Sequence, residues 1–265
     1  MNVGVLGLGA IGRRVAKALD EGIRGLSLAG ATARDRRKAE AFLGTLKGTP
    51  PFLTVDELIA KSDLVVEAST QAHLREIAPK VLGAGRDLVV LSCGGLLGRQ
   101  DWVKLAEAQG CRILVPSGAI AGLDGVKGAR LGEIAAITME TRKPPAGLAG
   151  APWIVEQKID LDAITTETLI FEGPAAEACR AFPANVNVLA ALSLAGIGPE
   201  LTRTKIYCVP GLAMNRHRIE VRGEFGRLSI DIENVPSENP RTGKLSYLST
   251  IALLRDLAAP LRVGT

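Results

Sequence analysis

Aromatic residues are scarce in this sequence, and their scarcity excludes a common class of binding protein. Only 3% of the 265 residues are Phe, Trp or Tyr, and they do not cluster with basic side chains. Single-stranded nucleic acids are held largely by stacking of their bases on such rings. The sequence therefore predicts no nucleic-acid partner.

Long apolar runs are also missing. No stretch approaches the roughly 18 to 20 residues that cross a membrane. The first predicted strand begins at Asn2 with no charged leader or cleavage site before it. We therefore expect no membrane partner and a cytoplasmic location.

Cysteine pairs and excess charge are limited too. The cysteines lie far apart, with no C-x-x-C pair and no histidine nearby, which favours reduced core residues and no metal site. Basic and acidic residues number 32 and 28 and are interspersed, so the net charge of +4 predicts only a mild attraction for anionic small molecules. The four cysteines are Cys93, Cys111, Cys179 and Cys208.

What the sequence does contain is glycine and aliphatic residues in a repeating order. Hydrophobic residues make up 47% of the chain and glycines number 30, as is typical of α/β proteins. Up to residue 116, short apolar strands alternate with helical patterns, and this alternation predicts a doubly wound parallel sheet, the Rossmann fold. The predicted strands are 2–6, 26–32, 64–68, 87–92 and 112–115, and the helices are 11–19, 38–43, 55–61, 71–83 and 100–109.

The pattern changes near residue 120, where longer, alternating strands replace the short repeating units. This change predicts a second, α+β domain with a largely antiparallel sheet. We expect a Rossmann domain at 1–120, a substrate and dimerisation domain at 121–240, and a C-terminal helix within 241–265 that packs back on the first domain. The predicted strands are 134–142, 166–172, 205–209, 217–222 and 226–234, the last three as successive antiparallel strands; helices are expected at 123–131, 175–181, 186–195 and 245–257, and 144–163 is a Pro/Gly/Ala-rich connection.

A glycine-rich turn follows the first predicted strand. It reads Gly7-Leu8-Gly9-Ala10-Ile11-Gly12 and opens a helix. Gly7 permits the tight turn, Gly9 lets the backbone approach a pyrophosphate, and Gly12 lets the helix pack on the strand. Because the N-terminus of a helix attracts anions, this turn predicts a dinucleotide site that includes Ala10 and Ile11.

The end of the second predicted strand bears on the choice between NAD and NADP. An NAD enzyme usually places an acid there for the ribose hydroxyls. Here Ala33 or Arg34 occupies that position, so Arg34 could bind a 2′-phosphate while Asp35 could still serve the ribose. The alternative is that the arginines simply form a solvated helix start. We expect NADP to bind at least as well as NAD.

Only two histidines are present for acid–base chemistry. His73 follows the third predicted strand, where a cap or first-turn helix role is favoured over contact with the nicotinamide. His217 begins a strand, and an exposed position flanked by arginines is an equal alternative. Asn187, Arg142 and Lys143 are further polar candidates, with helix capping or a solvated strand end as their alternatives. These residues indicate a two-domain NAD(P) oxidoreductase with an anionic substrate.

Five motifs in the second half resemble the L-aspartate dehydrogenase family. They occur in the family's order, and the likeness runs from the glycine turn to the last helix. The motifs occupy residues 116–124 (PSGAIAGLD), 141–145 (TRKPP), 182–188 (FPANVNV), 215–219 (NRHRI) and 233–240 (ENVPSENP).

The resemblance implies reversible, NAD(P)-dependent oxidation of L-aspartate to iminoaspartate by a homodimer. The product would yield oxaloacetate and ammonia, or feed quinolinate and NAD biosynthesis. The family's active-site histidine falls on His217, and its nicotinamide contacts fall near Ala121 and Asn187. Either NAD or NADP is expected as the cofactor.

The expected chemistry requires a proton acceptor and partners for two carboxylates. A histidine with a pKa near neutrality suits proton transfer in either direction, so His217 is the expected acid–base group. Lys143, Asn239 and Thr242 are candidates for binding the small-molecule substrate. Two alternatives stay open: a related oxidoreductase such as a homoserine dehydrogenase or dihydrodipicolinate reductase, and an NADP-binding sensor without catalysis.

Overall fold

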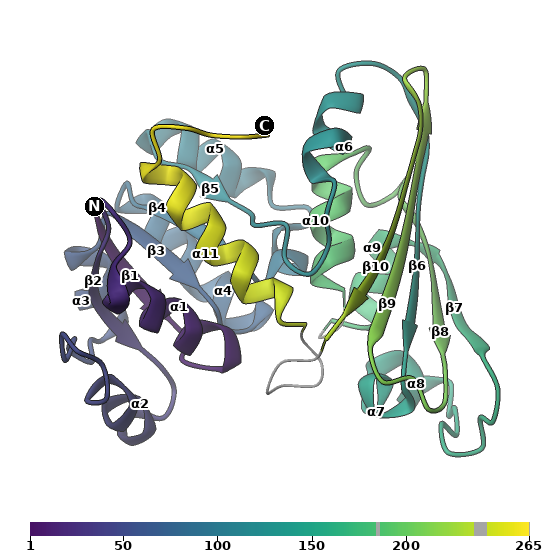
Figure 1. Cartoon of the computed structure of the whole chain (residues 1–265), viewed down its shortest axis with the longest axis horizontal. Helices are drawn as coiled ribbons and strands as arrows, with labels where there is room; N and C mark the ends of the chain where they lie inside the picture. The colour runs from purple at the N-terminus through teal and green to yellow at the C-terminus, as the bar shows by residue number, and fades with distance from the viewer. Residues whose placement is uncertain (184–185, 236–242, 265) are drawn as a thin grey trace. The chain divides into compact units, whose positions relative to one another are not determined.

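The computed structural model describes residues 1–183, 186–235 and 243–264 (Figure 1). The chain divides into two compact units. The first unit comprises Met1–Pro116 and Tyr247–Arg262, and the second comprises Ser117–Ser246 and Val263–Thr265.

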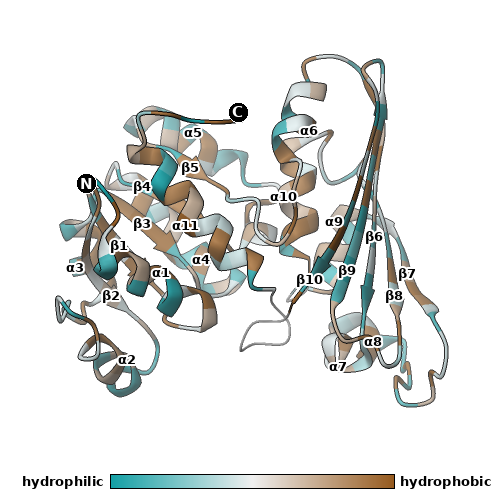
Figure 2. Cartoon of the chain, viewed as in Figure 1, coloured by the Kyte–Doolittle hydropathy of each residue, from teal (hydrophilic) through white to brown (hydrophobic). Residues whose placement is uncertain are grey.

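The first unit contains a five-stranded parallel sheet in the order β2-β1-β3-β4-β5. Its strands are mostly hydrophobic (Figure 2), because helices cover both faces of a doubly wound sheet. This confirms the predicted fold class, although β5 is shorter than the sequence pattern indicated. The strands are β1 (Asn2–Leu6), β2 (Ser27–Thr32), β3 (Leu64–Glu67), β4 (Asp87–Val90) and β5 (Ile113–Leu114).

The helices of the first unit pack their apolar residues against this sheet. Val15 and Leu19 of α1 join Val3 and Val5 of β1 in one buried cluster, which also includes Leu254 of the C-terminal helix. A short 3-10 helix after β4, η1, was absent from the predicted elements. The helices are α1 (Ala10–Gly22), α2 (Arg36–Leu43), α3 (Val55–Lys61), α4 (Gln71–Gly83), η1 (Cys93–Leu96), α5 (Gln100–Gln109) and α11 (Leu245–Ala258).

The second unit contains a five-stranded sheet in the order β10-β9-β6-β8-β7. Three of its four strand pairs are antiparallel, but β8 lies parallel to β6. The prediction that β8 and β9 are successive antiparallel neighbours is therefore wrong, because β6 from earlier in the chain lies between them. The strands are β6 (Ile134–Lys143), β7 (Thr168–Pro174), β8 (Arg203–Cys208), β9 (Asn215–Gly223) and β10 (Gly226–Asn234).

One face of the second sheet is covered by helices and the other faces outward. Ile137 and Met139 of β6 and Ile219 and Val221 of β9 are buried on the covered face, and the residues between them are more exposed. The composition of the connection after β6 predicted an irregular segment, but this connection contains two short helices, α7 and α8. The helices of this unit are α6 (Leu123–Ala129), α7 (Pro145–Leu148), α8 (Pro152–Glu156), α9 (Ala175–Ala181) and α10 (Asn187–Ala195).

Two general features concern the described residues as a whole. All four cysteines are buried and form no disulfide, as expected from their spacing. Within the described ranges, no helix is long and apolar enough to span a membrane.

Candidate active site

The glycine turn between β1 and α1 combines two steric requirements with one open space. Gly7 has φ +97°, a conformation that favours glycine, and a Cβ there would collide with the Ala68 carbonyl. A Cβ on Gly12 would collide with the Gly7 carbonyl oxygen. In contrast, a Cβ on Gly9 would meet no atom of the described residues within 4 Å, its two chain neighbours aside. The packing of the described residues therefore requires glycine at positions 7 and 12, whereas the space beside Gly9 is open.

The N-terminus of α1 begins at this open space. Gly9 is the N-cap residue and supplies no side chain to bond the first N–H groups of the helix. These N–H groups and the helix dipole favour an anion at this position. The turn thus fits the pyrophosphate of a dinucleotide.

Two residues after β2 have different roles: Asp35 caps a helix, and Arg34 is exposed to solvent. Asp35 is the N-cap of α2, and its Oδ1 accepts a hydrogen bond of 3.0 Å from the backbone N–H of Lys38. This bond is the main cause that lowers the pKa of Asp35. Arg36 pairs with Glu40 at 2.8 Å, as in the solvated helix start considered above. Arg34 is exposed.

His73 has the structural role that the sequence favoured. It lies in the first turn of α4, and its backbone N–H donates to Thr70 Oγ1 at 3.3 Å. Thr70 is the N-cap of this helix. His73 thus helps to begin α4.

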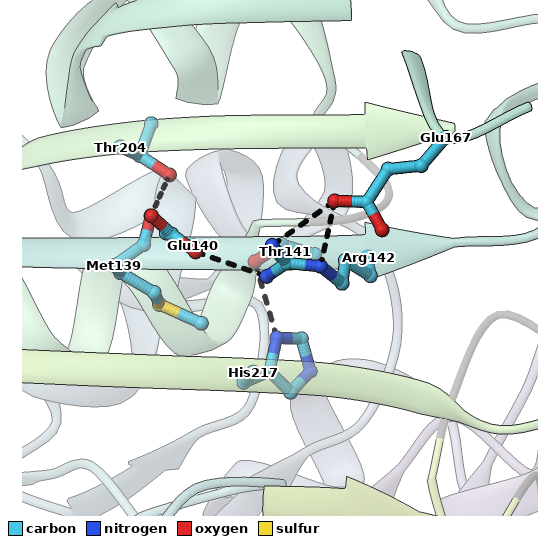
Figure 3. A network of polar contacts seen from close by, with 7 residues as sticks. All are labelled: Met139, Glu140, Thr141, Arg142, Glu167, Thr204 and His217. Carbon is cyan, nitrogen blue, oxygen red and sulfur yellow. Dashed lines mark hydrogen bonds and ion pairs between the residues drawn. The ribbon is translucent and has the colours of Figure 1, made fainter. Parts of the chain in front are cut away.

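The second histidine lies on the covered face of the second sheet. His217 of β9 pairs with Thr141 of β6 in the strand register, and its Nδ1 lies 3.1 Å from Thr141 Oγ1 (Figure 3). The exposed fractions of His217, Thr141, Lys143 and Asn215 are only 3 to 6%. The covered face is apolar along most of its length, so these side chains form a buried polar cluster at one end of it.

This burial decides one open alternative for His217 and overturns one expectation about it. The side chain is not exposed, and its pKa is lowered to about 3, first by burial and then by the charge of Lys143. A pKa near neutrality was therefore wrong for the protein without ligands. Burial penalises the charged imidazolium, and a nearby cation penalises it further.

The arginines near His217 belong to the opposite face of the sheet. Arg216 pairs with Glu233 at 2.9 Å and is exposed, so strand alternation separates it from His217. Arg142 pairs with Glu140 and Glu167 at 2.9 and 3.0 Å (Figure 3). These two carboxylates already engage the Arg142 guanidinium. Lys143, its neighbour in sequence, is the buried cation beside His217.

Ala121 and Asn187 lie in segments that approach each other within the second unit. Ala121 is exposed in the loop that precedes α6. In the same loop, a Cβ on Gly118 would lie 3.6 Å from Val188, the residue after Asn187 in the first turn of α10. Asn187 is not a helix cap, because the N-cap of α10 is Val186.

Two positioning contacts in this unit were not anticipated from the sequence. Thr141 contacts the ring of His217, and the buried Asn234 of β10 donates from Nδ2 to the Ala119 carbonyl at 2.7 Å. The first contact depends on the pairing of β6 with β9, and the second joins β10 to the loop before α6. Both link segments far apart in the sequence, although Thr141 and Asn234 lie within the motifs that carried the resemblance. Asn239 and Thr242 lie outside the described residues. Within the described ranges, no cluster of three potential His, Cys, Asp or Glu metal ligands occurs.

A dinucleotide-binding parallel sheet and a second unit with a buried histidine define a two-domain NAD(P)-dependent oxidoreductase. Two family models match the chain: "Homoserine dehydrogenase, NAD binding domain" over residues 7–116 and "Aspartate dehydrogenase, C-terminal" over residues 124–257.

Relatives match along the full chain. An L-aspartate dehydrogenase from Bradyrhizobium diazoefficiens is 48% identical over 100% of this chain and 94% of its own length. One from Methanosarcina barkeri is 44% identical over the whole of both chains. The crystal structure of aspartate dehydrogenase from Thermotoga maritima shares the fold, with a TM-score of 0.76 at 22% identity over 100% of this chain and 99% of that one. The chain belongs to the aspartate dehydrogenase family.

Proposed function

We propose that this protein is an NAD(P)-dependent L-aspartate dehydrogenase. It oxidises L-aspartate to iminoaspartate, which water converts to oxaloacetate and ammonia or which passes to quinolinate and NAD biosynthesis, and it catalyses the reverse reductive amination. The observation that carries this proposal is the buried His217 beside Lys143, in the unit that matches the aspartate dehydrogenase model.

The cofactor is assigned to residues that have space and donors for it. Gly7, Gly9 and Gly12 form the pyrophosphate turn with the N–H groups of Ala10 and Ile11. Arg34 binds the 2′-phosphate of NADP or Asp35 the ribose of NAD, and Ala121 and Asn187 contact the nicotinamide end. Bound by these residues, the cofactor would supply the acceptor for the hydride of the aspartate α-carbon.

His217 supplies proton transfer to this reaction. The amine of aspartate must lose a proton before its lone pair can form the C=N bond, and a neutral imidazole can accept that proton. Thr141 occupies Nδ1, so Nε2 is the nitrogen left for the substrate. Because its pKa is lowered, His217 stays neutral in the protein without substrate.

Lys143 links substrate binding to the basicity of His217. The Lys143 charge disfavours protonation of His217. A substrate carboxylate bound at Lys143 offsets that charge, so we expect the pKa of His217 to rise when aspartate binds. The imidazole then becomes a stronger base at the moment when a proton must be taken.

Two further properties follow from the family resemblance. We propose that the protein acts as a homodimer and that it works in the cytoplasm. Light scattering coupled to gel filtration measures the first property, and a mass of one chain, 27.8 kDa, would contradict it.

A steady-state assay tests the proposed activity. Oxaloacetate, ammonia and NADH or NADPH are supplied, cofactor oxidation is followed, and the amino-acid product is identified by chiral chromatography. L-Aspartate is the expected product. Because the first unit matches a homoserine dehydrogenase model, L-homoserine is tested separately in the oxidative direction with NAD and NADP. Turnover of homoserine without turnover of aspartate would contradict the proposal.

A further inference from the structure

Glu67 is a fully buried carboxylate at the end of β3, and it accepts hydrogen bonds from two turns. Its Oε1 accepts from the backbone N–H and the hydroxyl of Ser69, both at 2.7 Å, and from the Ser92 hydroxyl at 3.0 Å. Its Oε2 accepts from the Ser92 backbone N–H at 3.1 Å. One carboxylate therefore joins the turn after β3 to the turn after β4.

The position of Glu67 in the sheet relates it to the cofactor. The strand order β2-β1-β3-β4-β5 changes direction between β1 and β3, and ligands of such sheets bind outside the carboxyl ends of the strands at this point. Ala68, next to Glu67, donates its backbone N–H to the Leu6 carbonyl at 2.8 Å. The turn that Glu67 holds thus directly adjoins the glycine turn.

The two turns held by Glu67 belong to the nicotinamide half of the cofactor site. In doubly wound folds the end of β2 serves the adenosine ribose and the first turn serves the pyrophosphate, so the half of the sheet beyond β1 serves the other nucleotide. The turns also pack closely, because a Cβ on Gly94 would collide with the side chain of Gln71. Segments 68–71 and 92–95 are thus in contact and are joined through Glu67. We refer to these two segments together as the wall.

We propose that Glu67 is a positioning residue that holds this wall in the shape required by the nicotinamide half of NAD(P). The proposal rests on the dinucleotide binding proposed above. Two of the four donors are the backbone N–H groups of Ser69 and Ser92, whose directions are fixed by the chain. The side chain at position 67 must therefore present an acceptor to each of them. In a Glu67→Gln variant the amide can keep one oxygen toward the Oε1 donors, but its NH2 group then faces the Ser92 N–H. The two segments of the wall then no longer keep the shape that the nicotinamide half requires, while the rest of the sheet is unchanged.

The test compares binding of whole and partial cofactors. NADH binding is measured by fluorescence titration, and ADP, which lacks the nicotinamide half, is measured by calorimetry. Glu67→Gln should raise the Kd of NADH about fivefold or more and leave the Kd of ADP within about twofold. Ser62→Ala is the matched control, because it removes a buried hydroxyl that bonds the Leu58 carbonyl at the amino end of the same strand. It should lower the melting temperature without raising the Kd of NADH.

The outcomes separate this inference from the function on which it rests. If the wild-type protein binds no NADH or NADPH, the proposed function fails. If the wild type binds NADH and Glu67→Gln leaves its Kd unchanged, or raises the Kd of NADH and ADP by the same factor, the positioning role is overturned. Should Glu67→Gln fail to fold, Ser92→Ala and Ser69→Ala decide the matter, since each removes one hydroxyl donor. Each should raise the Kd of NADH, and not that of ADP, by about two- to threefold.

Discussion

The glycine turn of the first unit and the His217 cluster of the second differ in how they are built. The turn uses backbone shape: its key residues have no side chains, and its donors are the N–H groups of a helix start. The cluster uses buried side chains brought together by pairing of β6 and β9 across 76 residues. A backbone site of this kind can therefore be recognised within six consecutive residues, whereas a side-chain site depends on the whole sheet. We expect substitutions in the two regions to have different effects.

The largest expected effect is on turnover. His217→Gln removes the proton acceptor and should lower kcat by roughly 100- to 10,000-fold in both directions, while the Kd of NADH stays within about twofold. The matched control is His73→Gln, which changes the only other histidine and should leave kcat unchanged, since His73 bonds the Thr70 cap through its backbone. Near-normal kcat in His217→Gln would remove this residue from the mechanism.

The next effect separates cofactor binding from folding within the glycine turn. Gly9→Ala fills the space beside the helix start and should weaken NADH binding roughly 100-fold, as expected for the loss of about two charge-assisted hydrogen bonds. Its melting temperature should stay close to that of the wild type, because among the described residues only the chain neighbours of Gly9 lie within 4 Å of the added Cβ. Gly12→Ala should instead lower the melting temperature, because its Cβ collides with Gly7. Equal melting temperatures of the two variants would refute this distinction.

A smaller effect concerns the choice of cofactor. Arg34→Ala should raise the Kd of NADPH about tenfold and leave the Kd of NADH nearly unchanged, because only NADPH carries the 2′-phosphate. Lys38→Ala serves as a control for the nearby positive charge, since Lys38 pairs with the Asp35 cap. Equal weakening of both cofactors, or of neither, would show that Arg34 does not select NADP.

A further effect concerns stability in acid, which is measured without ligand. The pKa of His217 falls from an ordinary value of 6.5 to about 3 in the folded protein. Between these values the unfolded chain binds a proton that the folded chain does not, so stability falls as the pH drops, by at most about 1.4 kcal/mol per pH unit. Urea unfolding between pH 6.5 and pH 4 measures this slope. His217→Gln should show a shallower slope, and an unchanged slope would mean that His217 is not buried as a neutral group.

Much of the fold could be read from the sequence because its signals are local. The glycine turn and the βα alternation depend on neighbours in the chain. The order of strands in the second sheet could not be predicted this way. Periodicity identifies β8 as a strand, but the parallel pairing of β8 with β6 depends on contacts between residues more than 60 positions apart.

The candidate site shows the same limit at the level of single residues. Strand alternation places Arg216 and His217 on opposite faces of the sheet, but it does not indicate which face the helices cover. The low pKa of His217 was therefore missed. For the same reason Arg142 and Lys143 looked equivalent, although only Lys143 is buried on the histidine side. The signal for Glu67 was present as a lone acid ending the apolar strand Leu64–Glu67. Its four donors become visible only in three dimensions.

The most direct measurement follows hydrogen from the substrate to the cofactor. L-Aspartate deuterated at its α-carbon is incubated with the wild-type protein and NAD or NADP, and the reduced cofactor is analysed by mass spectrometry. The proposed reaction predicts one deuterium in each molecule of reduced cofactor, with matching amounts of oxaloacetate and ammonia. Reduced cofactor that carries no deuterium, or no reduction of either cofactor, would contradict it.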